Sequence, residues 1–131
     1  MSAKPYPFSA VIYAKDAQCL ASFYEDMLSL SRVEEGPGFI FLASEGLELS
    51  VVQAPAAIAE SIRLTDPPEV REVTPIKLSF QVADIKRTRI TVQRLGGGLK
   101  EPEATWSWRG ALHLDGFDPE GNVFQLRQSE A

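Results

Sequence analysis

The sequence predicts an α+β fold made of two βαβββ modules, and the main observation behind it is a repeat. Residues 8–16 (FSAVIYAKD) and residues 76–84 (IKLSFQVAD) have the same pattern of residue types. Apolar side chains alternate in both segments, and both end in an aspartate. Alternation of this length is typical of a strand with one buried face. Because similar segments follow both copies, we expect matching modules over residues 8–53 and 75–128.

A helix is expected directly after each repeat. Asp16 and Asp84 are suited to the N-cap position, since their carboxylates accept hydrogen bonds from the free N–H groups of a first helical turn. The first helix has apolar residues at helical spacing, namely Leu20, Phe23, Met27 and Leu28. The second has a less regular pattern with several β-branched residues, and the glycines at 96–98 predict its end.

Three strand-like runs are expected after each helix. They cover residues 31–35, 38–43 and 47–53 in the first module, and 99–103, 106–117 and 122–127 in the second. The last two runs are joined by DPEG at 118–121, a predicted turn in which proline presets the second position and glycine serves the last. Residues 54–74, with several prolines and scattered charge, are predicted to be a linker.

Composition narrows the possible partners and location. With 131 residues and 44% hydrophobic content, the chain can bury a core, whereas one module alone would be marginal. We therefore expect the modules to pair, either within one chain or between two chains, and we favour a homodimer. The net charge of −5 argues against nucleic acid and anionic membranes as partners. The sequence has no signal-like or bilayer-length apolar run, and a cytoplasmic location is expected.

Two motifs within this pattern carry a family resemblance. FYEDML at 23–28 and DPEGNVFQL at 118–126, together with the repeated βαβββ order, resemble the vicinal oxygen chelate superfamily. That superfamily includes glyoxalase I, extradiol dioxygenases, fosfomycin-resistance enzymes and bleomycin-resistance proteins. The resemblance covers about residues 8–127 and implies a curved mixed sheet of the glyoxalase/bleomycin-resistance type. Both motifs belong to the scaffold, so they imply the fold rather than the reaction.

The resemblance also implies where a metal would bind. Metal-dependent members carry a histidine in the first strand of each module and a glutamate in the last; here these positions fall on Ser9, Glu48, Lys77 and Gln125. A catalytic divalent ion generally needs three or more imidazole, thiolate or carboxylate ligands. Only Glu48 is a good ligand, and Lys77 would place a cation where the metal should be. We therefore expect no metal and no cofactor.

Without a metal, the implied cavity is expected to hold a small organic molecule. Strand alternation predicts that its wall includes Val11, Tyr13, Glu48, Ser50, Val52, Ser79, Gln81, Gln125 and Arg127. Lys77 is expected either to pair with Glu48 or a charged ligand, or to extend into solvent.

The segment WSWRG adds Trp106, Trp108 and Arg109 to the ligand-binding candidates. Indole rings stack on aromatic or sugar-bearing ligands, and a guanidinium holds a carboxylate or phosphate. Alternatively, one indole packs in the core and the other covers a sheet edge. His113, the only histidine, is either a packed strand residue or a general base.

Two functions from different classes follow. The first is a metal-independent protein that binds a small molecule. The second is a superfamily enzyme, a glyoxalase-like lyase or isomerase or a dioxygenase; a lyase or isomerase would use Glu48 as base and Lys77 to stabilise an enolate-like intermediate. The residues at the metal positions favour the first. A purely structural protein is a third reading, which requires that side chains fill the cavity.

Overall fold

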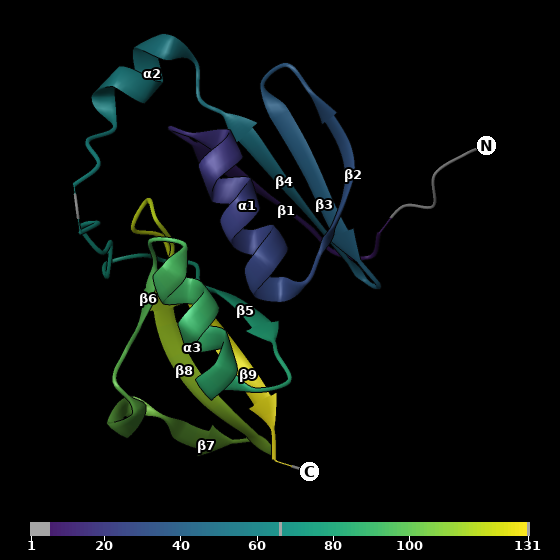
Figure 1. Cartoon of the computed structure of the whole chain (residues 1–131), viewed down its shortest axis with the longest axis vertical. Coiled ribbons are helices and arrows are strands. Elements are labelled where there is room, and N and C mark those ends of the chain that lie inside the picture. Colours follow the sequence, from purple (N-terminus) through teal and green to yellow (C-terminus); the bar gives the residue numbers. More distant parts are fainter. Residues whose placement is uncertain (1–5, 66, 131) are drawn as a thin grey trace. The chain divides into compact units, whose positions relative to one another are not determined.

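The computed structural model describes residues 6–65 and 67–130. The chain divides into two units, unit 1 up to Arg63 and unit 2 from Leu64. Each unit has its own sheet, with a helix packed on one face of it (Figure 1). Both sheets mix parallel and antiparallel strands, which confirms the predicted α+β class with two modules.

Unit 1 follows the predicted βαβββ order. Its elements are β1 (Ser9–Ala14), α1 (Ala17–Leu28), β2 (Ser31–Gly36), β3 (Phe39–Ser44) and β4 (Leu47–Gln53), followed by the short helix α2 (Ala56–Ser61). The strand order in the sheet is β1-β4-β3-β2. β1 pairs in parallel with β4, and the other pairs are antiparallel.

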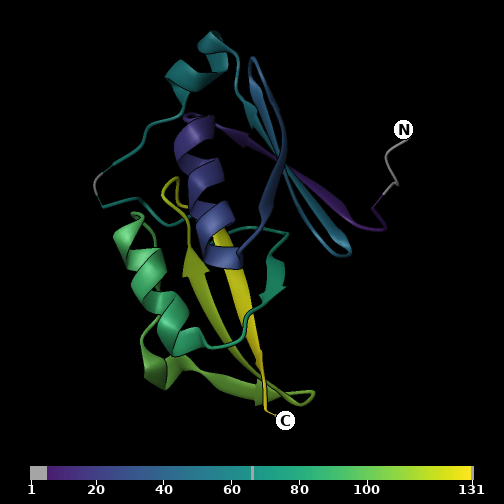
Figure 2. The ribbon, with the colours of Figure 1, turned by 45° about the vertical axis from the view of Figure 1, so that its right-hand side comes forward.

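Helix α1 begins and packs as its sequence predicts. The side chain of Asp16 accepts a hydrogen bond of 3.1 Å from the N–H of Cys19, which satisfies one free donor of the first turn. The helix packs on the sheet, against which Figure 2 shows the α1 ribbon lying. Each fully buried large apolar side chain of such a core contributes about 1.5–3 kcal/mol; the buried set is Leu20, Phe23, Tyr24, Met27, Ile40, Leu42, Leu49 and Val51.

Unit 2 repeats this plan with one additional strand. Its elements are β5 (Leu78–Gln81), α3 (Ile85–Arg94), β6 (Gly98–Leu99), a 3-10 turn (Pro102–Ala104), β7 (Trp106–Trp108), β8 (Ala111–Phe117) and β9 (Val123–Ser129). The strand order is β5-β9-β8-β6, with β7 also paired to β8. Asp84 caps α3 through the N–H groups of Lys86 and Arg87, as predicted.

Two of the strand predictions for unit 2 were wrong. The expected run 106–117 is two antiparallel strands, β7 and β8, because Arg109 and Gly110 both adopt positive φ (52° and 77°) and form a tight turn. The expected run 99–103 is strand only at Gly98–Leu99, since Pro102 has no N–H to donate to a ladder and opens a 3-10 turn instead.

The predicted linker has structure of its own. Pro55 stands at the N-cap of α2, an alanine-rich helix that the proline pattern had suggested would be irregular. Further on, the N–H of Arg71 donates to the carbonyl of Gly121 at 2.9 Å. Gly121 has φ +83°, and a Cβ there would lie 2.0 Å from the carbonyl oxygen of Glu69, so only glycine fits.

The β8–β9 turn is the one predicted from DPEG. Buried Asp118 accepts hydrogen bonds from the backbone N–H groups of Glu120 and Asn122, at 2.9 and 3.0 Å. The N–H of Gly121 also donates to the carbonyl of Asp118. The turn therefore anchors both the hairpin and the segment of unit 2 that leads into β5. Within the described residues, no helix has the length and hydropathy to cross a membrane.

Candidate functional site

Each sheet has one face packed on its helix and an opposite face that its own helix leaves uncovered. In unit 2 the helix side holds Phe80, Leu114, Phe124 and Leu126, all buried. The residues that alternate with them form what we call the open face of unit 2. Its polar members are Lys77, Ser79, Gln81, His113, Asp115, Gln125 and Arg127, and Ala111, Phe117 and Val123 are its apolar members. This alternation agrees with the sequence prediction for β5 and β9.

An ion pair lies on this open face. The ammonium Nζ of Lys77 is 2.9 Å from Oδ2 of Asp115, and it also lies 6.0 Å from the centre of the Trp106 ring. The other carboxylate oxygen of Asp115, Oδ1, is buried and has no hydrogen-bond donor among the described residues. Lys77 thus pairs with a carboxylate of its own unit, whereas Glu48, in unit 1, accepts from the hydroxyl of Ser9 at 3.1 Å.

Hydrogen bonds between neighbouring strands connect other polar residues of the open face of unit 2. The hydroxyl of Ser79 donates to Oε1 of Gln125 at 2.7 Å, and Nε of Arg127 donates to the same hydroxyl oxygen at 2.8 Å. Gln125 stands opposite Asp115 in the β8–β9 ladder, and Arg127 stands opposite His113. The network fixes Arg127 through Nε and leaves the two terminal nitrogens of its guanidinium for other acceptors.

The aromatic residues of β7 cover His113. The imidazole is 3% exposed and stacks on Trp106, with ring centres 5.3 Å apart, and Trp108 lies at 5.7 Å in a tilted arrangement. Its Nδ1 lies 3.1 Å from the carbonyl oxygen of Ala111. His113 has the packed position that the sequence offered as one reading. Neither indole is in the core, since Trp106 is 39% and Trp108 59% exposed, so the core reading of one tryptophan was wrong.

Among the described residues of unit 2, two sets line cavities. The larger, of about 420 Å³, adjoins the Lys77–Asp115 pair; its wall is made of Val70, Glu72, Thr74, Lys77, Leu99, Lys100, Asp115, Gly116, Phe117 and Val123. The smaller, of about 280 Å³, lies beside the β7–β8 turn; its wall is made of Trp108, Arg109, Ala111, His113 and Arg127. The cavities have no lining residue in common.

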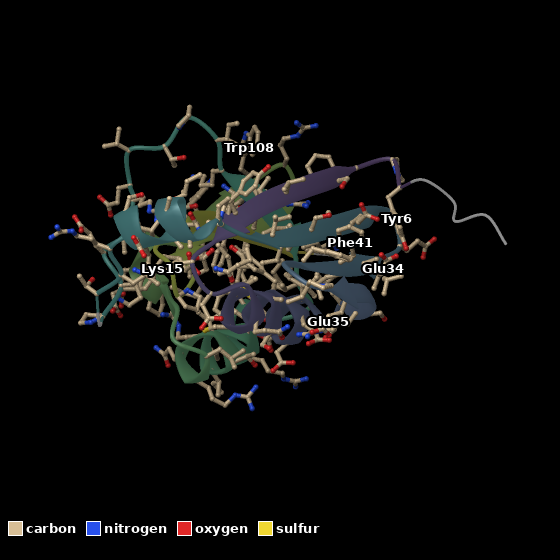
Figure 3. All side chains as sticks on the ribbon, turned by 90° about the horizontal axis from the view of Figure 1, so that it is seen from above. Tyr6, Lys15, Glu34, Glu35, Phe41 and Trp108 are labelled. Carbon is tan, nitrogen blue, oxygen red and sulfur yellow. The ribbon has the colours of Figure 1, made fainter. Side chains whose placement is uncertain are left out.

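The corresponding face of unit 1 has a different chemistry. Val11 and Tyr13 are 55% and 66% exposed, Ser50 is buried, and the rings of Phe39 and Phe41 lie 4.9 Å apart. We call the face opposite α1 the open face of unit 1. Figure 3 shows Phe41 and Glu34 away from α1, whereas Glu35 lies on the helix side.

Glu35 belongs to a charged cluster at the edge of unit 1. Hydrogen bonds from Gln18 and from Arg32 hold the pKa of the Glu35 carboxyl below its usual value. Arg32 also pairs with Glu25 of α1 at 3.1 Å. The cluster therefore joins β2 to α1 and is separate from the open face.

The four positions that the superfamily uses for metal carry side chains that contact other residues within each unit. Ser9 and Glu48 contact each other in unit 1, while in unit 2 Lys77 is paired with Asp115 and Gln125 with Ser79. A hydroxyl, one carboxylate, an ammonium and an amide are a poor donor set for zinc, iron or manganese. Nowhere in residues 6–65 and 67–130 do three histidine, cysteine, aspartate or glutamate side chains gather as ligands.

Sequence reasoning missed several residues of this site. Asp115 was not among the predicted site residues, because its position opposite Gln125 depends on the β8–β9 register. Val70, Glu72 and Thr74 were assigned to a linker, yet they form part of the larger cavity. The available signal was the alternation of β8, which puts Asp115 on the same face as His113.

Comparison with known proteins places this geometry in a family. The chain matches the glyoxalase-like domain family over residues 9–127. No curated protein matches the sequence.

Solved structures share the fold at low sequence identity. A glyoxalase/bleomycin resistance protein/dioxygenase family enzyme from Burkholderia phytofirmans is 18% identical with a TM-score of 0.69, covering 92% of this chain and 96% of that one. Lactoylglutathione lyase from Agrobacterium tumefaciens is 20% identical, with a TM-score of 0.59 and coverage of 96% and 95%.

A third similar structure is the fosfomycin resistance protein FosX from Mesorhizobium loti. It is 11% identical with a TM-score of 0.62, covering 98% of this chain and 93% of that one. Similarity at these identities shows the fold and leaves the chemistry to the residues themselves. Because the family match spans nearly the whole sequence, the chain belongs to the glyoxalase-like domain family.

Proposed function

We propose that this protein binds a small organic molecule without a metal ion, and that the ligand lies on the open face of unit 2. One observation carries the proposal: the 420 Å³ cavity has a charged pair in its wall, and the buried Oδ1 of Asp115 has no donor in the part of the chain that the structure describes. A buried acceptor left without a partner costs about 1–3 kcal/mol. A ligand N–H or O–H group would remove that cost.

The size and the lining of this cavity also suit a small organic molecule. Ligand sites typically have volumes of about 300–1,000 Å³ and combine apolar walls with a few polar groups. Leu99, Phe117 and Val123 supply apolar surface here, and Lys77 and Lys100 supply charge. Lys77 occupies a position where metal-dependent superfamily members carry a side chain that coordinates the metal. This supports a small molecule that is bound by hydrogen bonds, charge and apolar packing, without a metal ion.

The enzyme alternative requires rearrangement of the charged pair. To stabilise an enolate-like intermediate, Lys77 would exchange its 2.9 Å contact with Asp115 for the substrate oxygen. No observation in unit 2 favours that exchange.

A homodimer in the cytoplasm remains part of the binding proposal, and the exposed Val11 and Tyr13 of unit 1 offer apolar surface for such pairing.

Metal content tests the metal-independent part of the proposal. We expect purified protein to contain no stoichiometric manganese, zinc, iron or nickel, and we expect its melting temperature to stay the same with each ion or with EDTA, because a ligand of the folded state must raise it. A stoichiometric ion that raises the melting temperature, and that is lost in Glu48→Ala, would contradict the proposal and favour the enzyme alternative.

Ligand binding is tested with a library of small molecules that carry N–H or O–H donors, screened in EDTA by melting temperature. Binders of the larger cavity should stabilise the wild type and lose at least about tenfold in affinity in Asp115→Asn, where one oxygen becomes a donor. Glu45→Gln, an exposed turn position in unit 1, is the matched control. If no compound of the library raises the melting temperature of the wild type or of Glu45→Gln, the binding function is contradicted.

A further inference from the structure

The β7–β8 turn contains an arginine where the backbone favours other residues. Arg109 and Gly110 occupy the two central positions between Trp108 and Ala111, which are paired across the hairpin, and both have positive φ. A two-residue turn of this type prefers asparagine followed by glycine, since asparagine tolerates the left-handed region far better than arginine does. A residue that is kept in an unfavourable backbone conformation is a reason to look for a function.

The guanidinium of Arg109 lies at the smaller cavity. Its Cζ is 5.3 Å from the centre of the Trp108 ring, and Arg127 enters the same 280 Å³ space from β9. Two positively charged side chains therefore line one small cavity, although the chain as a whole carries a net charge of −5. Like charges brought together in this way favour an anion between them.

No carboxylate of the described residues neutralises this pair. Neither Arg109 nor Arg127 forms an ion pair there, and Arg127 uses only Nε, toward Ser79. Glu130 is joined to the turn by its backbone, as its N–H donates to the carbonyl of Gly110, but its carboxylate accepts from the hydroxyl of Ser107. The terminal nitrogens of both guanidiniums are therefore available to an exogenous acceptor, with the planar geometry that matches a carboxylate.

A flat apolar surface adjoins these donors. Trp108 is 59% exposed, and indole faces are good stacking surfaces for aromatic rings. We propose that the smaller cavity binds a small aromatic carboxylate, with its carboxylate between Arg109 and Arg127 and its ring against Trp108. This inference rests on the proposed binding function, but it concerns a cavity that shares no lining residue with the Lys77–Asp115 cavity.

Benzoate titration followed by tryptophan fluorescence tests the ligand class. The method is local, because both tryptophans of the chain lie on β7. Benzoate should change the emission at saturable concentrations. Benzamide, which keeps the ring and loses the charge, and acetate, which keeps the charge and loses the ring, should each bind at least about tenfold more weakly. Equal binding of benzamide and benzoate, or no saturable response to benzoate, would overturn the inference.

Arg109→Asn tests the residue while keeping the turn. Asparagine suits the left-handed position, so the melting temperature should stay the same or rise, while benzoate affinity should fall at least about tenfold. Arg87→Gln removes one exposed charge from α3 and should leave both quantities unchanged. A variant that folds and binds benzoate as tightly as the wild type would overturn the inference, and so would a lower melting temperature, because the arginine would then be structural.

Failure of this inference is distinguishable from failure of the proposed function. If library compounds bind and respond to Asp115→Asn while benzoate does not bind, the aromatic-anion site is wrong and the binding function stands. If the wild type binds neither benzoate nor any library compound, both are wrong.

Discussion

The open faces of the two units lie opposite the helix in both sheets but differ in chemistry. In unit 1 the face opposite α1 is mixed: Val11 and Tyr13 are more than half exposed, Phe39 and Phe41 lie side by side, and Ser9 bonds to Glu48. In unit 2 the equivalent residues form an ion pair, a serine–glutamine–arginine network and a histidine under two indoles. The helix sides show no such difference, since both bury apolar side chains. The repeat therefore conserves the scaffold and changes the surface.

This contrast has a physical reason. Helix-side residues must fill a packed core, where removal of a large side chain costs several kcal/mol, so both copies of the module need the same pattern. Residues opposite the helix meet no such requirement and can acquire charge. The ligand chemistry that we propose follows this division: it uses the face that the fold leaves unconstrained in unit 2.

The largest expected effect compares adjacent residues on the two sides of one strand. Leu126→Ala should destabilise the protein by about 2–5 kcal/mol, because Leu126 is fully buried, whereas Gln125→Ala should cost about 1 kcal/mol through loss of the bond to Ser79. Leu49→Ala and Glu48→Ala should repeat the contrast in unit 1. Urea unfolding measures all four, and equal costs within a pair would contradict the two-sided description.

A second comparison concerns the turns that close the two modules. Asp118→Ala should cost about 2–3 kcal/mol, because the buried carboxylate accepts from two backbone N–H groups and from the Asn122 amide. Glu45→Ala, in the exposed β3–β4 turn, should change stability by less than about 0.5 kcal/mol. Thermal unfolding of both variants provides the measurement. A mild Asp118→Ala variant would show that the β8–β9 turn is no better anchored than its counterpart.

A smaller effect is expected for the ion pair. Lys77→Met should cost about 1 kcal/mol, since the pair is partly exposed but its loss leaves Asp115 without its cation. Ser9→Ala, which removes the hydrogen bond to Glu48, should cost less, as that contact is exposed. Urea unfolding at low and high salt should show the Lys77 effect shrinking with salt. Equal costs at both positions would remove the electrostatic difference between the two faces.

The smallest effect is a pH dependence of stability that arises in unit 1. Hydrogen bonds from Gln18 and Arg32 lower the pKa of Glu35. The ionised Glu35 therefore adds to the free energy of unfolding above the ordinary glutamate pKa of about 4.3, and this addition is lost as the pH falls through the lowered value. Carboxyl-detected NMR titration should show this lowered pKa, and Arg32→Gln should raise it toward normal. An unchanged Glu35 pKa in Arg32→Gln would contradict the contact.

The sequence predicted the scaffold because the signals for it are local. Alternation in β1 and β5 and the capping aspartates act within a few residues, and the DPEG turn is read directly from its composition. Arg109 in a left-handed position had no such signal, since arginine does not normally mark a turn, and the 106–117 run was therefore read as one strand. Pro102 is a local signal against a strand at 99–103, because proline has no N–H to donate to a ladder.

The site was harder to predict because it depends on register and on chain segments distant in sequence. The partner of Lys77 is Asp115, and only the β8–β9 and β5–β9 pairings bring the two together. The polar face of β5 and β9 followed from alternation alone. The cavity wall formed by residues 70–74 depends on the bond from Arg71 to Gly121, for which the sequence offers no local sign.

The central claim is that ligand binding belongs to the open face of unit 2 and needs no metal. Amide NMR spectra of the labelled full chain, titrated in EDTA with benzoate and with the stabilising library compounds, test it most directly. We predict saturable shifts on β5, β7, β8 and β9, with β1 to β4 unchanged. Shifts that cluster on β1 to β4, or that appear only after a divalent metal is added, would contradict the account.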